Sequence, residues 1–184
     1  QLLPYGGAIE FNIEGYPSED FLQLVEKTKP AQCTLVPDAP DQLTSDHGWN
    51  VKQHGKQLKA ICSRLQAQGI RTSIFLDPSL EQIEFVPATG AERIELYTES
   101  YAAHYGTTQA DAIWQSYAAT AQRAQALGIA VNAGHDLDLQ NLARFLQIKA
   151  IQEVSIGHAL MVECIEQGMP AVVKQYLQIC SESA

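Results

Sequence analysis

Hydrophobic positions along the chain follow two alternating periods. Short runs in which apolar residues fill every second position, or nearly every position, predict strands. Between these runs, apolar residues three and four positions apart predict helices. Strand starts recur about every 20 to 40 residues, which is the spacing of βα units, so the sequence predicts an α/β protein with a parallel sheet. The six predicted strands cover residues 9–14, 33–37, 72–77, 93–98, 130–135 and 153–158.

Helix boundaries have recognisable signals. Serine is a good N-cap, glycine commonly follows the last helical turn, and proline suits the first turn. These signals predict a helix capped by Ser18, a helix ending at Gly69, a long helix over 109–127, one opening in DLDLQNLARFL (136–146), and a last one starting near Pro170. QAQGIRTSIFLD (66–77) and AQALGIAVNAG (124–134) show the same helix, glycine, strand join twice.

The first predicted strand is polar on one face. Glu10, Asn12 and Glu14 alternate with isoleucine and phenylalanine. A parallel strand in an open sheet is covered on both faces and should be almost continuously apolar, whereas the strands of a (β/α)₈ barrel have inward residues that face the active site near their carboxyl ends. We therefore expect one barrel domain over residues 1–184, with an open sheet whose polar strand ends are solvated as the alternative.

Composition and charge exclude several classes. The 184 residues carry a net charge of −9, which offers no broad cationic surface for nucleic acid. No apolar run is long enough for a membrane span, which favours the cytosol. Neither a zinc site nor a redox pair is supported by the spacing of the cysteines, which we expect to be reduced and mostly buried. The net charge does not exclude the binding of small anionic molecules, because the backbone N–H groups at a helix start can bind phosphate whatever the net charge. The four cysteines are Cys33, Cys62, Cys164 and Cys180.

Six segments together resemble the pyridoxine 5′-phosphate synthase family, whose enzymes close the pyridine ring in the deoxyxylulose-dependent route to vitamin B6. They are KTKPAQCTLVPD, QLTSDHGWNV, IFLDPSLEQI, GAERIELYTESYA, GIAVNAGHDL and EVSIGHAL, with N-A-G-H and S-I-G-H the most diagnostic. The resemblance implies a TIM (β/α)₈ barrel. It also implies that two βα units precede Gln1, so that six of eight are present.

The resemblance implies a reaction and its catalytic residues. Members of the family condense 3-amino-2-oxopropyl phosphate with 1-deoxy-D-xylulose 5-phosphate, giving pyridoxine 5′-phosphate, phosphate and water. No metal or other cofactor takes part, and the enzymes assemble as octamers, so we expect a homo-oligomeric transferase acting on small phosphorylated substrates. Glu14 matches the proton acceptor, His135 the general acid, and Glu95 the residue that stabilises the transition state.

Four further positions match the substrate-binding residues of the family. Gly157 and His158 match the phosphate site at the start of the last barrel helix, and Asp136 stands where glycine is common. If its carboxylate turned inward it would repel phosphate, and we expect it to cap the following helix instead. Thr44 lies in a loop over 38–50 that we interpret as a mobile lid. His47 and Trp49 depart from the glycine-rich acidic loop of the family.

Two other classes of function compete with this one. Another phosphate-handling barrel enzyme, such as an isomerase or aldolase, would share the fold, although an aldolase would need an inward lysine that the predicted strands lack. A non-catalytic phosphate-binding module is the second alternative, because six barrel strands leave two open edges. Without the resemblance, Glu14 is equally well read as a surface carboxylate, and a lone histidine at a strand end, such as His135, is more often a hydrogen-bonded structural residue.

Overall fold

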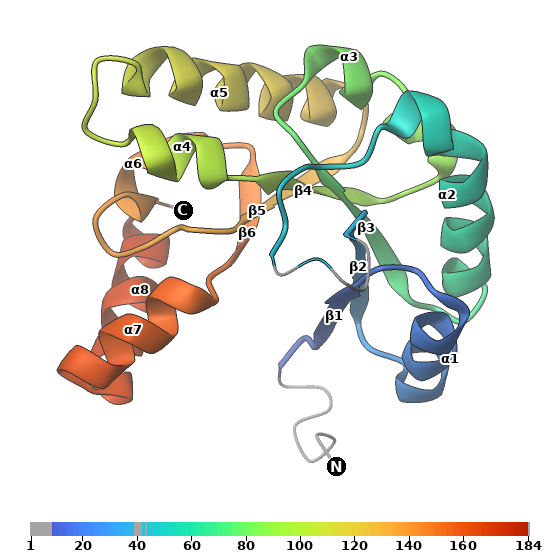
Figure 1. The fold of residues 1–184 in the computed structure, drawn as a ribbon, viewed down its shortest axis with the longest axis horizontal. Coiled ribbons are helices and arrows are strands. Elements are labelled where there is room, and N and C mark those ends of the chain that lie inside the picture. The colour runs from blue at the N-terminus through green and yellow to red at the C-terminus, as the bar shows by residue number, and fades with distance from the viewer. Residues whose placement is uncertain (1–8, 39–41, 43, 184) are drawn as a thin grey trace.

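The computed structural model describes residues 9–38, 42 and 44–183. Its strands form one parallel sheet in strictly sequential order, as the alternation of strand and helix predicts. The sheet curls, and the helices cover its outer face (Figure 1). The strands are β1 (Asn12–Gly15), β2 (Gln32–Leu35), β3 (Arg71–Leu76), β4 (Arg93–Tyr97), β5 (Ala130–Gly134) and β6 (Ile151–Ser155). All six predicted strands are present, each displaced by at most a few residues.

The helices begin and end near the predicted signals. Ser18 accepts a hydrogen bond from the N–H of Phe21 at 3.2 Å and so caps the first helix, and Pro170 lies in the first turn of the last. The helices are α1 (Glu19–Thr28), α2 (Val51–Gln66), α3 (Leu80–Ile83), the 3₁₀ helix η2 (Val86–Thr89), α4 (Glu99–His104), α5 (Ala110–Ala126), α6 (Leu142–Phe145), α7 (His158–Gln167) and α8 (Met169–Ser183).

The repeated join has the same backbone geometry both times. Gly69 and Gly128 have φ angles of 77° and 78°, which are left-handed values that glycine adopts without steric cost. In each join the glycine N–H bonds to the carbonyl three residues back, and the next residue bonds five residues back. The chain thus turns from α2 into β3 and from α5 into β5 by one shared device.

One predicted helix is much shorter than expected. DLDLQNLARFL contains only the four-residue α6, because residues 139–141 form turns. Asp138 explains the difference, since its Oδ1 accepts the N–H groups of Gln140 and Asn141 at 2.9 and 2.8 Å. This side chain competes with helical hydrogen bonding and delays the helix.

The outer face of the sheet and the inner faces of the helices form the hydrophobic core. Leu35, Ile74, Leu96 and Val131 are each 0% exposed. Burial of such side chains stabilises the fold by about 1.5–3 kcal/mol apiece. The cysteines are all free, and only Cys33 and Cys62 are buried, so the expected burial holds for half of them.

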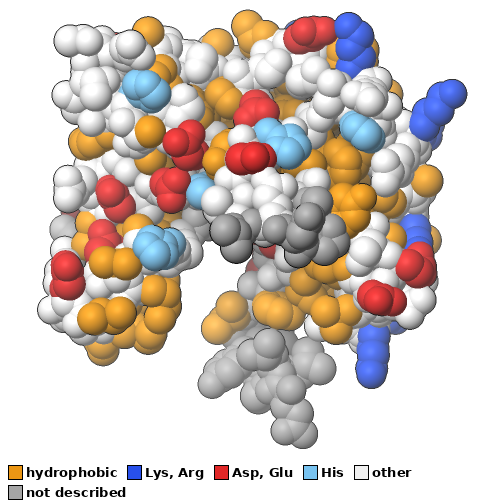
Figure 2. Space-filling view, in the orientation of Figure 1, with side chains coloured by type: hydrophobic (Ala, Val, Ile, Leu, Met, Phe, Trp, Pro, Cys, Tyr) orange, Lys and Arg blue, Asp and Glu red, His pale blue; other side chains and the backbone are white. Residues whose placement is uncertain are grey.

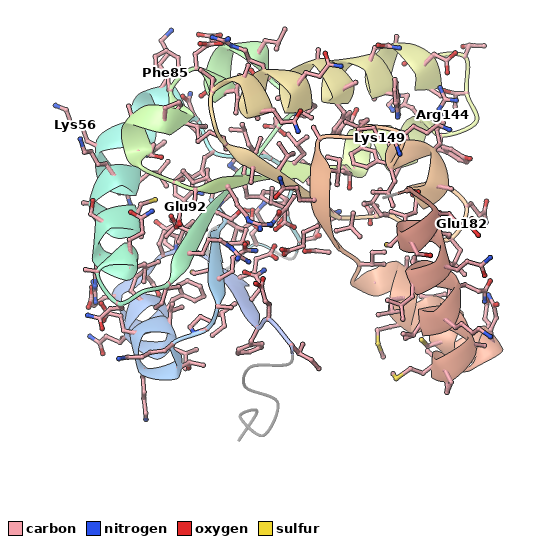
Figure 3. All side chains as sticks on the ribbon, turned by 180° about the vertical axis from the view of Figure 1, so that it is seen from behind. Lys56, Phe85, Glu92, Arg144, Lys149 and Glu182 are labelled. Carbon is pink, nitrogen blue, oxygen red and sulfur yellow. The ribbon has the colours of Figure 1, made fainter. Side chains whose placement is uncertain are left out.

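The amino end of the curled interior is filled by a polar network, as the alternating strands predict. Gln32 on β2 donates to Glu153 on β6 at 3.1 Å, so strands far apart in the sheet order approach each other across the interior. Arg93 donates to Asn132 and Glu153 at 2.8 and 3.1 Å, and Arg71 binds Glu10 at 2.5 Å. Seen from behind, side chains fill the space that the strands surround (Figure 3).

The arch of strands stays open between β1 and β6, the two edges of the sheet (Figure 1). Apolar side chains are exposed on the helices α7 and α8, which follow β6, and Figure 2 shows this hydrophobic surface. They are Met161, Val162, Ile165, Met169, Val173 and Leu177. Within the part of the chain that the structure describes, no helix is both long and apolar enough to cross a membrane.

Candidate active site

A cavity of about 510 Å³ lies at the carboxyl end of the strands. All seven residues proposed from the sequence line it, together with three others. Its volume is within the range of small-molecule sites. In the middle of the same face, acidic and histidine side chains gather (Figure 2). The lining residues are Glu14, Thr44, Phe75, Glu95, His135, Asp136, Ser155, Ile156, Gly157 and His158. Their position supports the roles predicted from the sequence, which themselves stay predictions.

His135 follows β5 with an unusual backbone. Its φ is 85° and that of Asp136 is 59°, values that cost non-glycine residues about 1–3 kcal/mol each. Thr98 holds this turn, because its hydroxyl donates to the carbonyl of Gly134 at 2.7 Å and also to that of His135. Asn141 donates to the carbonyl of Asp136 at 3.1 Å. The strained turn thus directs the imidazole into the cavity.

The imidazole of His135 is contacted on both nitrogens. Nε2 lies 3.1 Å from the hydroxyl of Thr44. Nδ1 lies 2.9 Å from Asp136 Oδ2, although the angles are not those of a hydrogen bond. Nδ1 has no hydrogen-bond partner among the described residues. The ring of Tyr97 packs edge-on against the imidazole with the centroids 4.9 Å apart. Three neighbours therefore fix the ring.

Glu95 is almost completely buried in the wall of the cavity, with 1% of its surface exposed. Removal from water raises the pKa of its carboxyl to about 8, and the nearby Glu14 carboxylate acts in the same direction, whereas hydroxyls of Ser155 and Thr34 oppose it. A side chain on Gly134 would place its Cβ 2.3 Å from Glu95 Oε1. The glycine of N-A-G-H therefore makes room for this carboxyl group.

Glu14 lies on the edge strand β1, where the residue is accessible to water. Its carboxylate is nevertheless crowded by protein on the cavity side. Partial removal from water and the charge of Asp38 raise its pKa, while the charge of His135 lowers it. An elevated pKa makes Glu14 a better base near neutral pH.

Gly157 and His158 lie where the chain passes from β6 into α7. Gly157 is the N-cap residue and no side chain caps the helix. The first helical bond runs from Met161 to Gly157, so the N–H groups of residues 158–160 have no backbone partner in the described structure. No atom lies within 4 Å of the position that a Cβ on Gly157 would occupy. Such a helix start suits an anion that approaches the backbone closely.

The expected capping role of Asp136 is wrong. The next helix, α6, begins at Leu142, and Asp138 supplies the carboxylate that organises the turn before it. Asp136 instead lines the cavity and faces His135. Its carboxylate is therefore directed toward the site, as in the unfavourable case considered for phosphate.

The loop over 38–50 is partly anchored. Residues 39–41 and 43 of the interpreted lid lie outside the described residues. Trp49, whose effect the sequence left open, is 5% exposed, and its indole donates to the carbonyl of Leu35 at 2.9 Å. Gly48 donates its N–H to Asp77 at 3.0 Å. His47 is exposed beside Asp46. The end of the loop is thus fixed to β2 and to the end of β3.

Sequence reasoning missed several residues of the site. Phe75 and Ser155 line the cavity from β3 and β6. Both occupy inward positions in the alternation of their strands, and this signal was sufficient to find them. Tyr97 and Thr98 act on His135 from β4 and the residue after it, but only the folded structure brings them to it.

Comparisons with known proteins assign the family. The family model described as "Pyridoxal phosphate biosynthesis protein PdxJ" matches residues 3–182. The chain belongs to the PdxJ family. Relatives named "Pyridoxine 5'-phosphate synthase" include one from Agrobacterium fabrum, 50% identical over 94% of this chain and 70% of its own length. Another, from Parabacteroides distasonis, is 50% identical over 91% of this chain and 70% of its own. The PdxJ resemblance read from the sequence is confirmed.

A solved structure supports the fold independently. The structure titled "Native KDPGal structure" matches with a TM-score of 0.62 at 13% identity, and covers 96% of this chain and 73% of its own. At this identity the likeness shows the fold alone. The curled parallel sheet of this PdxJ member is thus a partial TIM barrel with six βα units.

Proposed function

We propose that the chain is a pyridoxine 5′-phosphate synthase, a transferase. It condenses 3-amino-2-oxopropyl phosphate with 1-deoxy-D-xylulose 5-phosphate to pyridoxine 5′-phosphate, phosphate and water. The observation that carries the proposal is that the residues matching the family's catalytic and binding positions line one cavity. These residues come from the strands β1, β4 and β5 or their ends, from the loop and from the start of α7. The PdxJ family match supports the same reaction.

The proposed chemistry needs groups that take and give protons. Ring closure requires addition of an amine to a ketone, loss of water, loss of phosphate and deprotonation at carbon. Glu14, with its raised pKa and exposure to the cavity, takes the proton from carbon. His135 first takes a proton on Nε2, which lies beside the hydroxyl of Thr44, and then gives that proton to the departing oxygen. Both groups lie at the rim where barrel enzymes hold their catalytic residues.

Glu95 has a separate part in this proposal. Because its pKa is raised to about 8, it holds its proton at neutral pH and donates a hydrogen bond without adding a second negative charge beside Glu14. As charge develops on the substrate, Glu95 stabilises the transition state from the wall of the cavity.

Substrate binding uses the start of α7 and the loop. The free N–H groups at the start of α7 bind the phosphate of the amino-ketone, next to Gly157 and His158. Thr44 contacts the second phosphorylated substrate from the loop. A lysine for Schiff-base aldol chemistry is absent from the six strands that the structure describes, which disfavours an aldolase.

Assembly and location belong to the same proposal. We propose a single domain over 1–184 that assembles as a homo-oligomer in the cytoplasm. The exposed apolar side chains of α7 and α8 support assembly, because such a surface is usually covered. Sedimentation at micromolar protein concentration measures the assembly, and a mass near 20.2 kDa would contradict it.

The reaction is tested with the purified chain and both phosphorylated substrates. We expect pyridoxine 5′-phosphate, identified by mass, to form together with one equivalent of phosphate. His135→Asn should reduce kcat while leaving KM almost unchanged, because the imidazole acts mainly in the transition state. Phosphate binding without any product would favour the non-catalytic alternative. Turnover of an aldol substrate in place of ring closure would favour the other barrel enzymes.

A further inference from the structure

We infer that Asp136 is a positioning residue for His135: its carboxylate places the ring proton on Nδ1 and leaves Nε2 free to exchange a proton with the substrate. The inference rests on the proposed function only for the identity of that substrate. Its structural basis is the 2.9 Å separation of Asp136 Oδ2 from His135 Nδ1.

The surroundings of the imidazole leave Asp136 as the group that acts on Nδ1. This nitrogen is buried and no hydrogen-bond acceptor with good angles reaches it among the described residues. A neutral imidazole carries one proton, and a carboxylate attracts an N–H far more than a lone pair. Nε2 then has its lone pair toward the hydroxyl of Thr44 at 3.1 Å, which donates to it.

The backbone holds the carboxylate in this place. Asp136 has a φ of 59°, a left-handed value that aspartate tolerates better than most residues. Asn141 holds its carbonyl at 3.1 Å. Asp136 takes part in no helix cap, since Asp138 accepts the N–H groups of the following turn. The strained backbone therefore has a consequence for the site, because it turns the carboxylate toward the ring.

The same carboxylate opposes phosphate. Asp136 lines the cavity with Gly157 and His158 at the start of α7. A negative charge there repels a phosphorylated substrate. Asp136 thus improves proton transfer but weakens the binding of phosphate. Its removal should therefore lower both kcat and KM, a combination that the loss of a merely structural residue would not produce.

The ¹⁵N signals of the His135 ring test the inference directly, without substrate. They are assigned by their loss in His135→Gln. In the wild type at a pH where the ring is neutral, we expect a protonated Nδ1 and an unprotonated Nε2. In Asp136→Gly, whose glycine fits the left-handed backbone and should fold, we expect the population to move to the form protonated on Nε2. A wild-type ring protonated on Nε2, or equal populations in both proteins, would overturn the inference.

Two further variants separate charge from folding. Asp136→Asn keeps an oxygen acceptor, so Nδ1 should stay protonated. Asp138→Asn is the matched control in the same loop, because its side chain binds the turn and does not line the cavity. We expect it to leave the ring signals unchanged. A shift in Asp138→Asn equal to that in Asp136→Gly would assign the effect to the loop and overturn the inference.

Kinetics supply a second readout. Asp136→Gly should lower kcat about 10-fold, since the general acid loses its orientation, and should lower KM for the amino-ketone phosphate because the repulsion is removed. A rise in KM, or an unchanged kcat, contradicts the inference. If the ring signals respond as expected but no variant makes product, the proposed function fails and the Asp136 contact stands. If the enzyme makes product and the ring signals are the same in the wild type and in Asp136→Gly, the proposed function stands and the inference about Asp136 is overturned.

Discussion

Both ends of the barrel interior are lined by charged side chains, but the two ends differ in how these charges are paired. At the amino end, Arg71 and Arg93 bind Glu10 and Glu153, and Gln32 completes the network. At the carboxyl end, the described lining residues include three carboxylates and two histidines but no lysine or arginine. The ion pairs of the amino end hold the fold, whereas burial and a neighbouring negative charge raise the pKa values of Glu14 and Glu95 at the carboxyl end and make these two groups available for chemistry.

The largest effect is expected from replacing a carboxylate at the carboxyl end. Glu14→Gln keeps the shape of the side chain but removes the proposed base, so kcat should fall by about 100-fold or more. Melting should be almost unchanged, because Glu14 makes no hydrogen bond or ion pair among the described residues. The matched control is Glu10→Gln on the same side of the chain at the other end, where kcat should be retained. Equal losses of turnover in both variants would remove the contrast between the ends.

The amino end should respond in stability and not in rate. Arg93 bonds to Asn132 and Glu153, and its side chain is only 16% exposed. Arg93→Met leaves Glu153 with a poorer partner, so we expect the free energy of unfolding in urea to fall by about 2–4 kcal/mol. Adding Glu153→Gln should restore part of the loss. A single variant with full stability would show that the network contributes little.

The pH dependence of stability distinguishes the two ends further. The raised pKa of Glu95, about 8, means that the folded chain holds a proton which the unfolded chain releases near pH 4.5. The free energy of unfolding should therefore decrease as pH rises from about 5 to 8, by a few kcal/mol. Glu95→Gln should flatten this decrease, as measured by urea unfolding at several pH values. A slope that persists in the variant would assign it to other groups.

The smallest effect is expected at the loop. Tyr97 donates its hydroxyl to the carbonyl of Ser45 at 2.8 Å and packs its ring on His135. Tyr97→Phe removes only the hydrogen bond, worth about 1 kcal/mol. We expect hydrogen exchange near Ser45 to accelerate and KM to rise a few-fold, with kcat retained. A large loss of kcat would show instead that the hydroxyl acts on His135.

The sequence predicted the sheet well because each strand carries its own signal. Periods of two, the glycine joins and Ser18 are local features, and the structure retains them. The prediction of a helix over 136–146 was wrong for an equally local reason, because Asp138 accepts hydrogen bonds from the following N–H groups. Local chemistry thus decided both the success and the error.

Contacts between residues of distant strands could not be predicted from the sequence. The position of Asp136 against His135 depends on two left-handed residues in succession. The effect of the Asp38 charge on the pKa of Glu14 depends on how the residues after β2 lie beside the edge strand β1. Family motifs indicated which residues belong to the site. They gave no information on which nitrogen of His135 faces which group, because that follows from torsions and not from spacing.

The strictly sequential strand order has a consequence for how the chain acquires its structure. Each βα unit pairs only with its predecessor, so the sheet can grow from one end during synthesis with short loop closures at every step. The bond between Gln32 and Glu153 is different, because it joins residues 121 positions apart. It can form only after the sixth strand has left the ribosome, so the polar network of the amino end is completed late in synthesis.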